Sequence, residues 1–405
     1  MKINGKRLWN HLQELGKIGK NSDGSVTRLA YSDEDEQAKS FIECWMKEAG
    51  LEVYIDACGN VIGTLPGQDR SLSPVVCGSH FDTVKEGGIF DGCLGVLAGI
   101  EVLQTMKENQ IMPLQDIRVI GFRDEEGNRF GYGMIGSHSV CGIVDKAGLK
   151  SQDFQGRTLE DVMLSKGYQP QNYASCYMGD IRAYLELHIE QASLLASQGC
   201  PVGIVTGIAG LERYTMTIHG RSAHSGATPM NYRQDPVLAM SKWILKVTEL
   251  AKSYPSTVAT VGVIETHPGA CNIICDHVTF SLDLRSLDDD VRKDIMLKMK
   301  DYEIELTEEF GVSFERRLDQ TLTALHCHED IMKKIEMSCC EDNVHYQYLV
   351  SGAGHDCMNF KNLCPTGMIF VASQNHGASH CKEEFSTFED CQIGCQILFE
   401  TLLKL

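Results

Sequence analysis

The sequence predicts an α/β protein with a mixed, largely parallel sheet, helices on both faces, and an inserted α+β domain of the ferredoxin-like type. Two observations lead to this prediction. In the outer parts of the chain, short β-branched runs alternate with helical stretches, as in a parallel sheet with crossover helices. The middle of the chain instead shows the order β-α-β-β-α-β, which is that of a split βαβ domain.

The composition is that of a globular chain with a large core. The 405 residues are 43% hydrophobic and 23% charged, and at roughly 150 residues per domain this length predicts two or three domains. The 37 basic and 55 acidic residues leave a net charge of −18. Because phosphate groups are bound by basic stripes, this balance argues against nucleic acid and anionic membrane surfaces as partners. No stretch reaches the ~18 apolar residues of a membrane span.

The seventeen cysteines favour a reducing compartment. Their number is odd, and no pair has the Cys-x-x-Cys spacing of a zinc site. The chain is too long for a small disulfide-stapled domain, and its first ten residues lack the apolar segment of a signal peptide. We therefore expect reduced, mostly buried thiols in a cytoplasmic protein, with disulfides as the weaker alternative.

The outer parts of the chain supply the elements of the sheet domain. The first ~70 residues are predicted to form a helix, a turn and a second helix, because acids at 33–36 precede an amphipathic run that ends at Gly50. A further helix face is marked by Val96, Ile100 and Leu103. Apolar runs rich in β-branched residues predict four buried strands, at 74–79, 117–122, 183–189 and 368–371.

The middle of the chain is predicted to form the inserted domain. Its expected elements are, in order, an alternating strand through 214–218, a helix over about 235–252, a strand near 257–265, a second alternating strand through 278–284, a helix over about 288–310 and a last strand at 312–314. The period of two in the alternating strands indicates a sheet with one buried face. The chain is thus expected to divide into a sheet domain of residues 1–207 and 321–405 and an insertion at 208–320.

Acidic and histidine side chains recur at or shortly after the ends of the predicted strands. In parallel α/β sheets, ligands bind outside the carboxyl ends of the strands. The residues at these positions are His80, Asp82, Asp91, Glu125, Glu126, His188 and His380. Their side chains are therefore expected to meet at one edge of the sheet.

Three imidazoles and several carboxylates are the ligand set of a dinuclear divalent-metal site. Imidazole suits zinc and its neighbours, and a carboxylate can bridge two cations ~3.5–4 Å apart. The predicted assignment gives Asp91 the bridge, His80 and His188 to one ion, and Glu126 and His380 to the other. Zinc is the first expectation, with manganese, cobalt or nickel as alternatives, because these ligands serve all four metals.

Two further acids have predicted roles beside the metals. Asp82 lies two residues after His80 and can orient its ring as a hydrogen-bonded carboxylate. Glu125 precedes the ligand Glu126 and is the expected general base for the attacking water. Taken singly, a histidine at a strand end or an acidic loop such as 124–126 is more often structural, and only their conjunction favours a metal hydrolase.

Five motifs around these residues resemble the amidase/carbamoylase branch of the dinuclear-metal M20 peptidase family. They are Gly-Ser-His80-Phe-Asp82-Thr, Asp91-Gly-Cys-Leu-Gly, Asp-Glu125-Glu126-Gly-Asn-Arg-Phe, Glu-Leu-His188-Ile-Glu-Gln191 and Ser-His380-Cys-Lys-Glu-Glu384. The branch includes N-carbamoyl-L-amino-acid hydrolases, allantoate amidohydrolases and metal-type β-ureidopropionases. The resemblance covers nearly the whole chain. It implies the metal and base assignments above, and a clam shell whose inserted domain is a lid that also forms a homodimer.

The resemblance also implies roles for residues of the insertion and for two residues near the ligands. His224 would stabilise the oxyanion of the tetrahedral intermediate, where a donor facing developing charge contributes strongly. Asn272 and Arg285 would grip the substrate carboxylate, a task suited to the Arg fork. Gln191 would contact the ureido group, and His355 would lie beside the site. Without the resemblance, His224 is a capping residue of a turn and Arg285 a charge at a strand end.

The function implied is metal-dependent hydrolysis of N-carbamoyl-L-amino acids, small ureido acids, to amino acid, ammonia and carbon dioxide. Allantoate amidohydrolase, or an aminoacylase or dipeptidase on the same scaffold, are the alternatives among enzymes. Ala192, the loop 373–377 and the pair Cys381-Lys382 depart from the usual pattern near the substrate pocket, so they leave the substrate open. Outside the enzymes, the alternative is a metal-free binding protein, since a purely structural module leaves the ligand set unexplained. The His-Cys-His run at 326–328 falls where the insertion should rejoin, and we expect a linker there.

Overall fold

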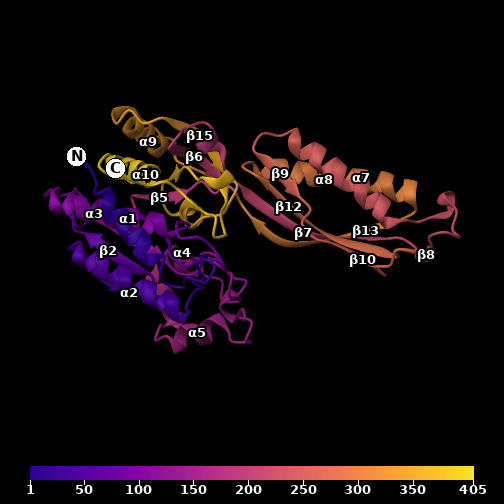
Figure 1. The fold of residues 1–405 in the computed structure, drawn as a ribbon, viewed down its shortest axis with the longest axis horizontal. Helices are drawn as coiled ribbons and strands as arrows, with labels where there is room; N and C mark the ends of the chain where they lie inside the picture. The colour runs from indigo at the N-terminus through magenta and orange to yellow at the C-terminus, as the bar shows by residue number, and fades with distance from the viewer. The chain divides into compact units, whose positions relative to one another are not determined.

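The computed structural model describes residues 1–405, which form two compact units (Figure 1). The first unit consists of Met1–Thr206, Cys327–Leu349 and His355–Leu405, and the second of Gly207–His326 and Val350–Gly354. Residue 207, residues 321–326 and Val350–Gly354 were expected in the sheet domain, but they belong to the second unit. There, the N–H of Ala209 donates to the carbonyl of Ser351 (2.8 Å). The run 326–328 spans the point where the chain returns to the first unit.

The first unit is built on a sheet whose central strands are parallel. Its strands are β1 (Glu52–Ile55), β2 (Val61–Leu65), β3 (Val75–His80), β4 (Ile117–Phe122), β5 (Ala183–Ile189), β6 (Val202–Ile208), β15 (Tyr346–Ser351) and β16 (Thr366–Val371). In the order β1-β2-β4-β3-β5-β16-β6, the pairs β4/β3, β3/β5 and β5/β16 are parallel and the flanking pairs antiparallel. This mixed sheet with a parallel centre confirms the predicted fold class.

Helices cover this sheet. They are α1 (Gly5–Leu15), α2 (Asp33–Glu48), α3 (Cys93–Glu108), α4 (Ile135–Val140), α5 (Leu159–Ser165), α6 (Leu194–Ser197), α9 (Glu329–Glu341) and α10 (Phe388–Leu402), with short 3-10 helices η1 (Gly148–Lys150), η2 (Pro170–Cys176), η4 (Asp356–Asn362) and η5 (Asn375–Gly377). On one face, Val75 and Leu187 share an apolar cluster with α1, α2, α3, α9 and α10. On the other face, Phe360 of η4 stacks on Tyr184 of β5, with ring centroids 3.9 Å apart. Because side chains alternate along a strand, His188 points to this second face.

Capping residues explain where several helices begin. The Ser32 hydroxyl accepts the N–H of Asp35 at the start of α2 (3.2 Å), and four acids lie in the first turn, where the helix dipole favours negative charge. The two helices expected at the start of the chain are present. The prediction missed β1 and β2, which follow them, because β1 has only four residues with alternate positions exposed and leaves little pattern.

The second unit contains a separate antiparallel sheet. Its elements are β7 (Gly210–His219), β8 (Ala223–His224), η3 (Met230–Tyr232), α7 (Pro236–Lys252), β9 (Thr257–Thr260), β10 (Ile264–His267), β11 (Ile273–Ile274), β12 (His277–Ser286), α8 (Asp289–Phe310), β13 (Ser313–Leu322) and β14 (Leu325–His326). The sheet has the order β10-β12-β7-β13, β9 also pairs with β12, and β8 pairs with β11. β14 lies outside this sheet, since its Leu325 is opposite Ile208 at the end of β6. The prediction of a single strand at 257–265 is wrong, because this segment forms two strands, β9 and β10. Between them, the N–H groups of Gly262 and Val263 donate to the Ser281 hydroxyl (3.3 and 3.1 Å) instead of a strand partner.

The two helices α7 and α8 cover one face of this sheet and leave the other open. Trp243 of α7 is fully buried against Phe280 of β12, and its indole N–H donates to Glu303 of α8 (3.0 Å). Along β12, buried and half-buried residues alternate strictly. The half-buried positions, which include Arg285, therefore form the open face of the sheet. None of the helices in either unit combines the length and apolarity needed to cross a bilayer.

Candidate metal centre

The predicted metal ligands lie together at one edge of the first unit's sheet. His80 ends β3, Glu125 and Glu126 follow β4, and His188 lies near the end of β5. These neighbouring strands are parallel, so their carboxyl ends share an edge. Asp91 comes from the turn before α3 and His380 from the loop after β16. We call the five predicted ligands, without Glu125, the Asp91 cluster: His80, Asp91, Glu126, His188 and His380.

Asp91 lies at the centre of this cluster. One of its carboxylate oxygens, Oδ1, is 3.0 Å from Nε2 of His188 and 3.4 Å from Nε2 of His80. The other, Oδ2, is 3.2 Å from Nε2 of His380, which is itself 3.6 Å from Glu126 Oε1. Potential ligand atoms within 4.8 Å of one another define three groups, one of which is His80, Glu125 and Glu126. The other two share Asp91: His80, Asp91 and His188, and Asp91, Glu126 and His380. This is the pairing that the sequence predicts for two ions with a carboxylate bridge.

The imidazoles of His80 and His188 turn Nε2 toward Asp91. Nδ1 of His188 lies 2.9 Å from the carbonyl of Ile189, and Nδ1 of His80 lies 3.2 Å from the carbonyl of Asp82. An Nδ1–H that donates to a carbonyl leaves the Nε2 lone pair for a cation, which is the usual arrangement around bound metals. The donor set and its orientation therefore fit divalent ions.

The cluster and the neighbouring Glu125 contain buried carboxylates whose negative charge is costly without nearby cations. Burial raises the pKa of Glu125 well above its usual value and that of Glu126 to about 8, with Asp91 contributing to the latter. Burial would raise the pKa of Asp91 too, but the imidazoles around it, His188 first, hold it well below the usual value. Because buried carboxylates are costly unless paired, bound cations would offset their charge.

The turn that carries Asp91 requires a glycine at its next position. Gly92 has φ +63°, and a Cβ there would lie 2.4 Å from Cε1 of His80. A side chain at this position would therefore displace the imidazole of His80. The Gly92 N–H also meets Nε2 of His188 (3.2 Å), so the backbone itself packs against two ligands.

Asp82 has a further role that the sequence did not indicate. Its carboxylate oxygen Oδ1 lies 3.5 Å from Nδ1 of His80, which agrees with the expected orienting role. The same carboxylate accepts the backbone N–H groups of Glu125 and Glu126 (3.1 and 3.2 Å). It thus joins the end of β3 to the loop after β4, and places Glu125 Oε2 3.8 Å from Nε2 of His80.

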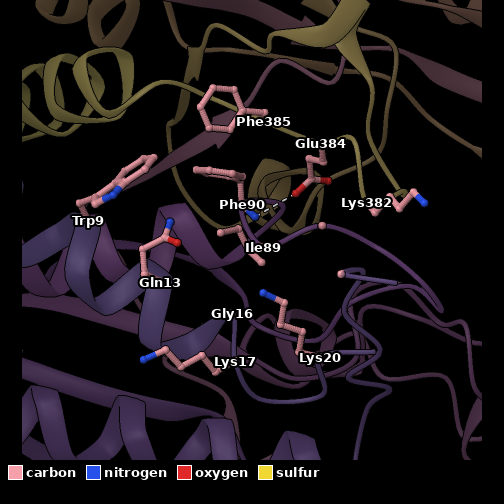
Figure 2. A pocket seen from close by; sticks show the side chains of 12 residues that line it. Trp9, Gln13, Gly16, Lys17, Lys20, Ile89, Phe90, Lys382, Glu384 and Phe385 are labelled. Atoms are coloured by element: carbon pink, nitrogen blue, oxygen red, sulfur yellow. Dashed lines mark hydrogen bonds between the residues drawn. The ribbon is translucent and has the colours of Figure 1, made fainter. Parts of the chain in front are cut away.

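Glu384 is a site residue to which sequence reasoning gave no role. Its Oε1 accepts the N–H groups of Phe90 and Asp91 (2.9 and 3.0 Å), and the Ser379 hydroxyl contacts both Asp91 Oδ2 (3.1 Å) and Glu384 Oε2 (3.3 Å). Figure 2 shows this carboxylate at the wall of a hollow of about 330 Å³ that Phe90 and Lys382 also line. Burial, with Asp91 nearby, raises its pKa to about 7. The only signal in the sequence was a glutamate four residues after a ligand.

Glu186 is a second buried carboxylate of the site to which the sequence pattern assigns no role. It accepts hydrogen bonds from the Ser79 hydroxyl (2.8 Å), the Cys357 N–H (2.9 Å) and the Tyr184 hydroxyl (3.2 Å). Burial raises its pKa. It lies two residues before His188 on the same face of β5, and that spacing was the available signal.

Gln191 and His355 both contact the cluster. Gln191, with φ +57°, donates from Nε2 to Asp91 Oδ2 (2.7 Å), while its Oε1 is buried without a hydrogen-bond partner. The His355 ring lies edge-on to His188, with centroids 4.4 Å apart. Burial and the neighbouring His188 hold the pKa of His355 well below its usual value, so this imidazole is neutral.

The three remaining predicted residues lie in the second unit. His224 of β8 is exposed, and its Nδ1 accepts the N–H groups of Gly226 and Ala227 (3.1 and 3.2 Å). Asn272 is close to it, since its carbonyl accepts the N–H of the residue after His224 (3.0 Å). Arg285 of β12 holds both oxygens of Asp283 (2.7 and 3.1 Å) and donates to the Gly352 carbonyl (2.7 Å).

All seventeen cysteines are free thiols. None belongs to the groups that could hold a metal ion. Cys77 and Cys93 are close in sequence to His80 and Asp91. Both thiols are buried, and burial raises the pKa of each. These two thiols therefore pack in the apolar core.

The chain matches known proteins along its whole length. A model of the peptidase family M20/M25/M40 matches residues 76–404. The N-carbamoyl-L-amino acid amidohydrolase of Geobacillus stearothermophilus is 42% identical over 405 residues, which is 100% of this chain and 99% of that one. The allantoate amidohydrolase of Escherichia coli (strain K12) is 33% identical over 96% of this chain and 95% of that protein.

A solved structure agrees with these sequence relatives. The amidase of the hydantoinase/carbamoylase family from Burkholderia multivorans superposes with a TM-score of 0.94 at 33% identity, over 100% of this chain and 98% of that one. The range matched by the family model contains every residue of the Asp91 cluster, and the resemblance of the five motifs is confirmed. The chain therefore belongs to the peptidase family M20/M25/M40, in its carbamoylase branch, and is an amidohydrolase that acts on carbon–nitrogen amide bonds.

Proposed function

We propose that the protein hydrolyses the carbamoyl amide bond of N-carbamoyl-L-amino acids to amino acid, ammonia and carbon dioxide. The observation that carries this proposal is the Asp91 cluster with Glu125 beside it, in a chain 42% identical to a relative named for that activity. Allantoate is the alternative substrate, because a relative at 33% identity is named for it.

Two divalent metal ions are part of the proposal. Asp91 would bridge them, with His80 and His188 on one and Glu126 and His380 on the other. When bound, such ions lower the pKa of a water molecule and polarise the carbamoyl oxygen. Zinc fits the imidazole and carboxylate donors, as do manganese, cobalt and nickel.

Glu125 is the proposed general base. Its carboxylate lies beside the cluster, 3.8 Å from Nε2 of His80, and burial raises its pKa well above the usual value, so it can accept a proton from water. It then returns that proton to the leaving nitrogen, and the C–N bond breaks. Asp82 holds the backbone of Glu125 and Glu126 and so positions the base relative to His80.

Residues from both units are proposed to hold the substrate. Arg285 spends three of its five N–H groups on Asp283 and Gly352, and the two that remain can grip a carboxylate together with Asn272. His224 would face the oxyanion. The unpartnered Oε1 of Gln191 suits an N–H donor of the ureido group, and neutral His355 packs behind the ligands.

A substrate panel tests the proposal. Ammonia release is measured with enzyme loaded in turn with Zn²⁺, Mn²⁺, Co²⁺ or Ni²⁺, on N-carbamoyl-L-amino acids, their D-isomers, allantoate, N-acetyl-amino acids and dipeptides. The L-carbamoyl compounds should give the largest kcat/KM. Faster turnover of allantoate would identify allantoate, rather than an N-carbamoyl-L-amino acid, as the substrate. Cleavage of dipeptides without turnover of any ureido acid would refute the carbamoylase proposal.

The assembly and the compartment are also proposals. The second unit would form a homodimer, and the enzyme would be cytoplasmic, in keeping with its free thiols. Sedimentation equilibrium checks the first point, since a homodimer has twice the mass of the chain.

A further inference from the structure

Three histidines of the second unit lie side by side across three neighbouring strands. In the register of the sheet, His267 of β10 is opposite His277 of β12, and His277 is opposite His219 of β7. Residues directly opposite on antiparallel strands have Cβ atoms about 4.5–5.5 Å apart and point to the same face. We call these three residues the histidine row.

The row lies on the open face of the sheet, away from α7 and α8. His277 precedes Val278, which is buried among the residues of these helices, so its own side chain points to the opposite face. The side chains of His219 and His277 are 49% and 35% exposed, and His267 is exposed as well. A solvated ion can therefore reach all three rings.

The rings are already close to one another. Those of His267 and His277 are stacked, with centroids 4.4 Å apart and 13° between their planes. Those of His277 and His219 are 5.9 Å apart. Imidazole nitrogens bind zinc at roughly 2.0–2.1 Å, so ligand nitrogens on one ion lie within about 4 Å of each other. Binding of one ion by all three rings would require rotation about χ2, which is a broad torsion for histidine, to turn their nitrogens toward a common point.

Carboxylates next to the row favour a bound cation. Nδ1 of His277 is hydrogen-bonded to the carboxylate of Asp276, which leaves Nε2 of His277 as the nitrogen for a ligand bond. Glu315 Oε2 is 3.5 Å from Nε2 of His219. Glu265 lies two residues before His267 on β10, and Glu315 is opposite Thr217, two residues before His219 on β7. A carboxylate that orients a ligand imidazole is a recurrent feature of metal sites.

We propose that the histidine row binds one transition-metal ion of the copper, nickel or zinc type. The site is separate from the Asp91 cluster and does not depend on the proposed function. Imidazole donors select these metals over Mg²⁺ and Ca²⁺, which prefer oxygen. Bound metal would tie the edge strand β10 to β12 and β7.

Counting metal in matched variants tests the site. The full-length protein, the double variant His219→Asn/His277→Asn and the control His345→Asn are each dialysed against excess Zn²⁺, desalted, and analysed for zinc per chain. His345 is an exposed histidine of the first unit, so it matches the chemical change outside the row. The double variant should hold one ion per chain fewer than the other two proteins. Equal zinc in all three refutes the site, and a failure of the Asp91 cluster lowers all three equally.

A measurement on the unaltered chain keeps the test decisive even if the double variant misfolds. Exposed imidazoles react with diethyl pyrocarbonate, and mass spectrometry of the peptides reports each histidine. Zn²⁺ or Ni²⁺ should protect His219, His267 and His277 together and leave His345 reactive, whereas Mg²⁺ should protect none of them. Unchanged labelling of the row in the presence of Zn²⁺ and Ni²⁺ overturns the proposal.

Discussion

The Asp91 cluster of the first unit and the histidine row of the second unit use the same side chains in opposite settings. The side chains of His80 and His188 are 2% and 1% exposed, whereas those of His219 and His277 are 49% and 35% exposed. Buried rings are held by carbonyl partners and by packing, but the rings of the row are placed mainly by strand register. Strand register can therefore bring histidines together, while burial fixes the direction in which their rings point.

The carboxylates beside the two sets of histidines also differ in burial, and so in the free-energy cost of their charge. Glu125 and Glu126 are buried, and burial raises their pKa values. Glu315 beside the row is 74% exposed, so water solvates its charge. Bound cations therefore relieve a larger penalty in the first unit. We expect the Asp91 cluster to bind metal more tightly than the row.

The largest effect is expected from Asp91→Asn. Because each Asp91 oxygen faces a different group of ligands, this change removes the bridging charge, and amide hydrolysis should fall to the background rate with loss of bound metal. Chelation of the wild-type protein should have the same result, reversed by adding metal back. Elemental analysis and ammonia release are the measurements. A variant that retains two ions and activity would show that Asp91 is not central.

Glu125→Gln should separate chemistry from metal binding. The amide cannot take a proton, so kcat should fall by about 10²- to 10⁴-fold, the usual contribution of a general base. Metal content and thermal stability should stay close to those of the wild type, since Glu125 is not one of the five proposed ligands. Activity above a tenth of the wild-type value would remove Glu125 as the base.

Glu384→Gln tests positioning from behind the cluster. Glu384 accepts two backbone N–H groups of the turn that carries Asp91, and loss of such an outer partner typically costs about 10- to 100-fold in metal affinity or activity. Glu383→Gln is the matched control, since the neighbouring side chain is exposed. Metal titration followed by activity distinguishes the two. Equal metal affinity and activity in both variants would mean that Glu384 does not position Asp91.

The smallest effect is expected in the second unit, from Arg285→Lys. Lysine keeps the charge but loses the fork, so kcat/KM should fall roughly tenfold through a higher KM, in line with hydrogen bonds to charged groups. Arg213→Lys is the control, because Arg213 also pairs with Asp283 (2.8 Å). Steady-state kinetics and melting temperature are measured for both. A KM shift of the same size in the control would show that the effect comes from Asp283 rather than from substrate.

The close approach of the proposed ligands could be predicted because three of their strands are neighbours and parallel. Apolar runs reveal such strands, and their carboxyl ends must share an edge, so His80, Glu126 and His188 were expected together. The elements that were missed or misplaced left weaker patterns. β1 has only four residues, and the division between β9 and β10 depends on one hydroxyl from β12, Ser281.

The residues that support the proposed ligands could not be predicted from the sequence, because their contacts join segments far apart in the chain. Glu384 meets a turn nearly 300 residues earlier in the chain, and Asp82 joins two loops 43 residues apart. No local pattern reports such contacts, since a carboxylate in a loop looks the same whether it is solvated or accepts a backbone N–H.

Strand periodicity and motif spacing are local properties of the chain, so they were enough to predict the residue types at the strand ends, the family and a proposed ligand set. The direction of each imidazole, the burial of the carboxylates and the row of histidines from three strands could be read only from the folded chain. These properties depend on packing and register between segments, because burial and cross-strand neighbours exist only after the chain has folded.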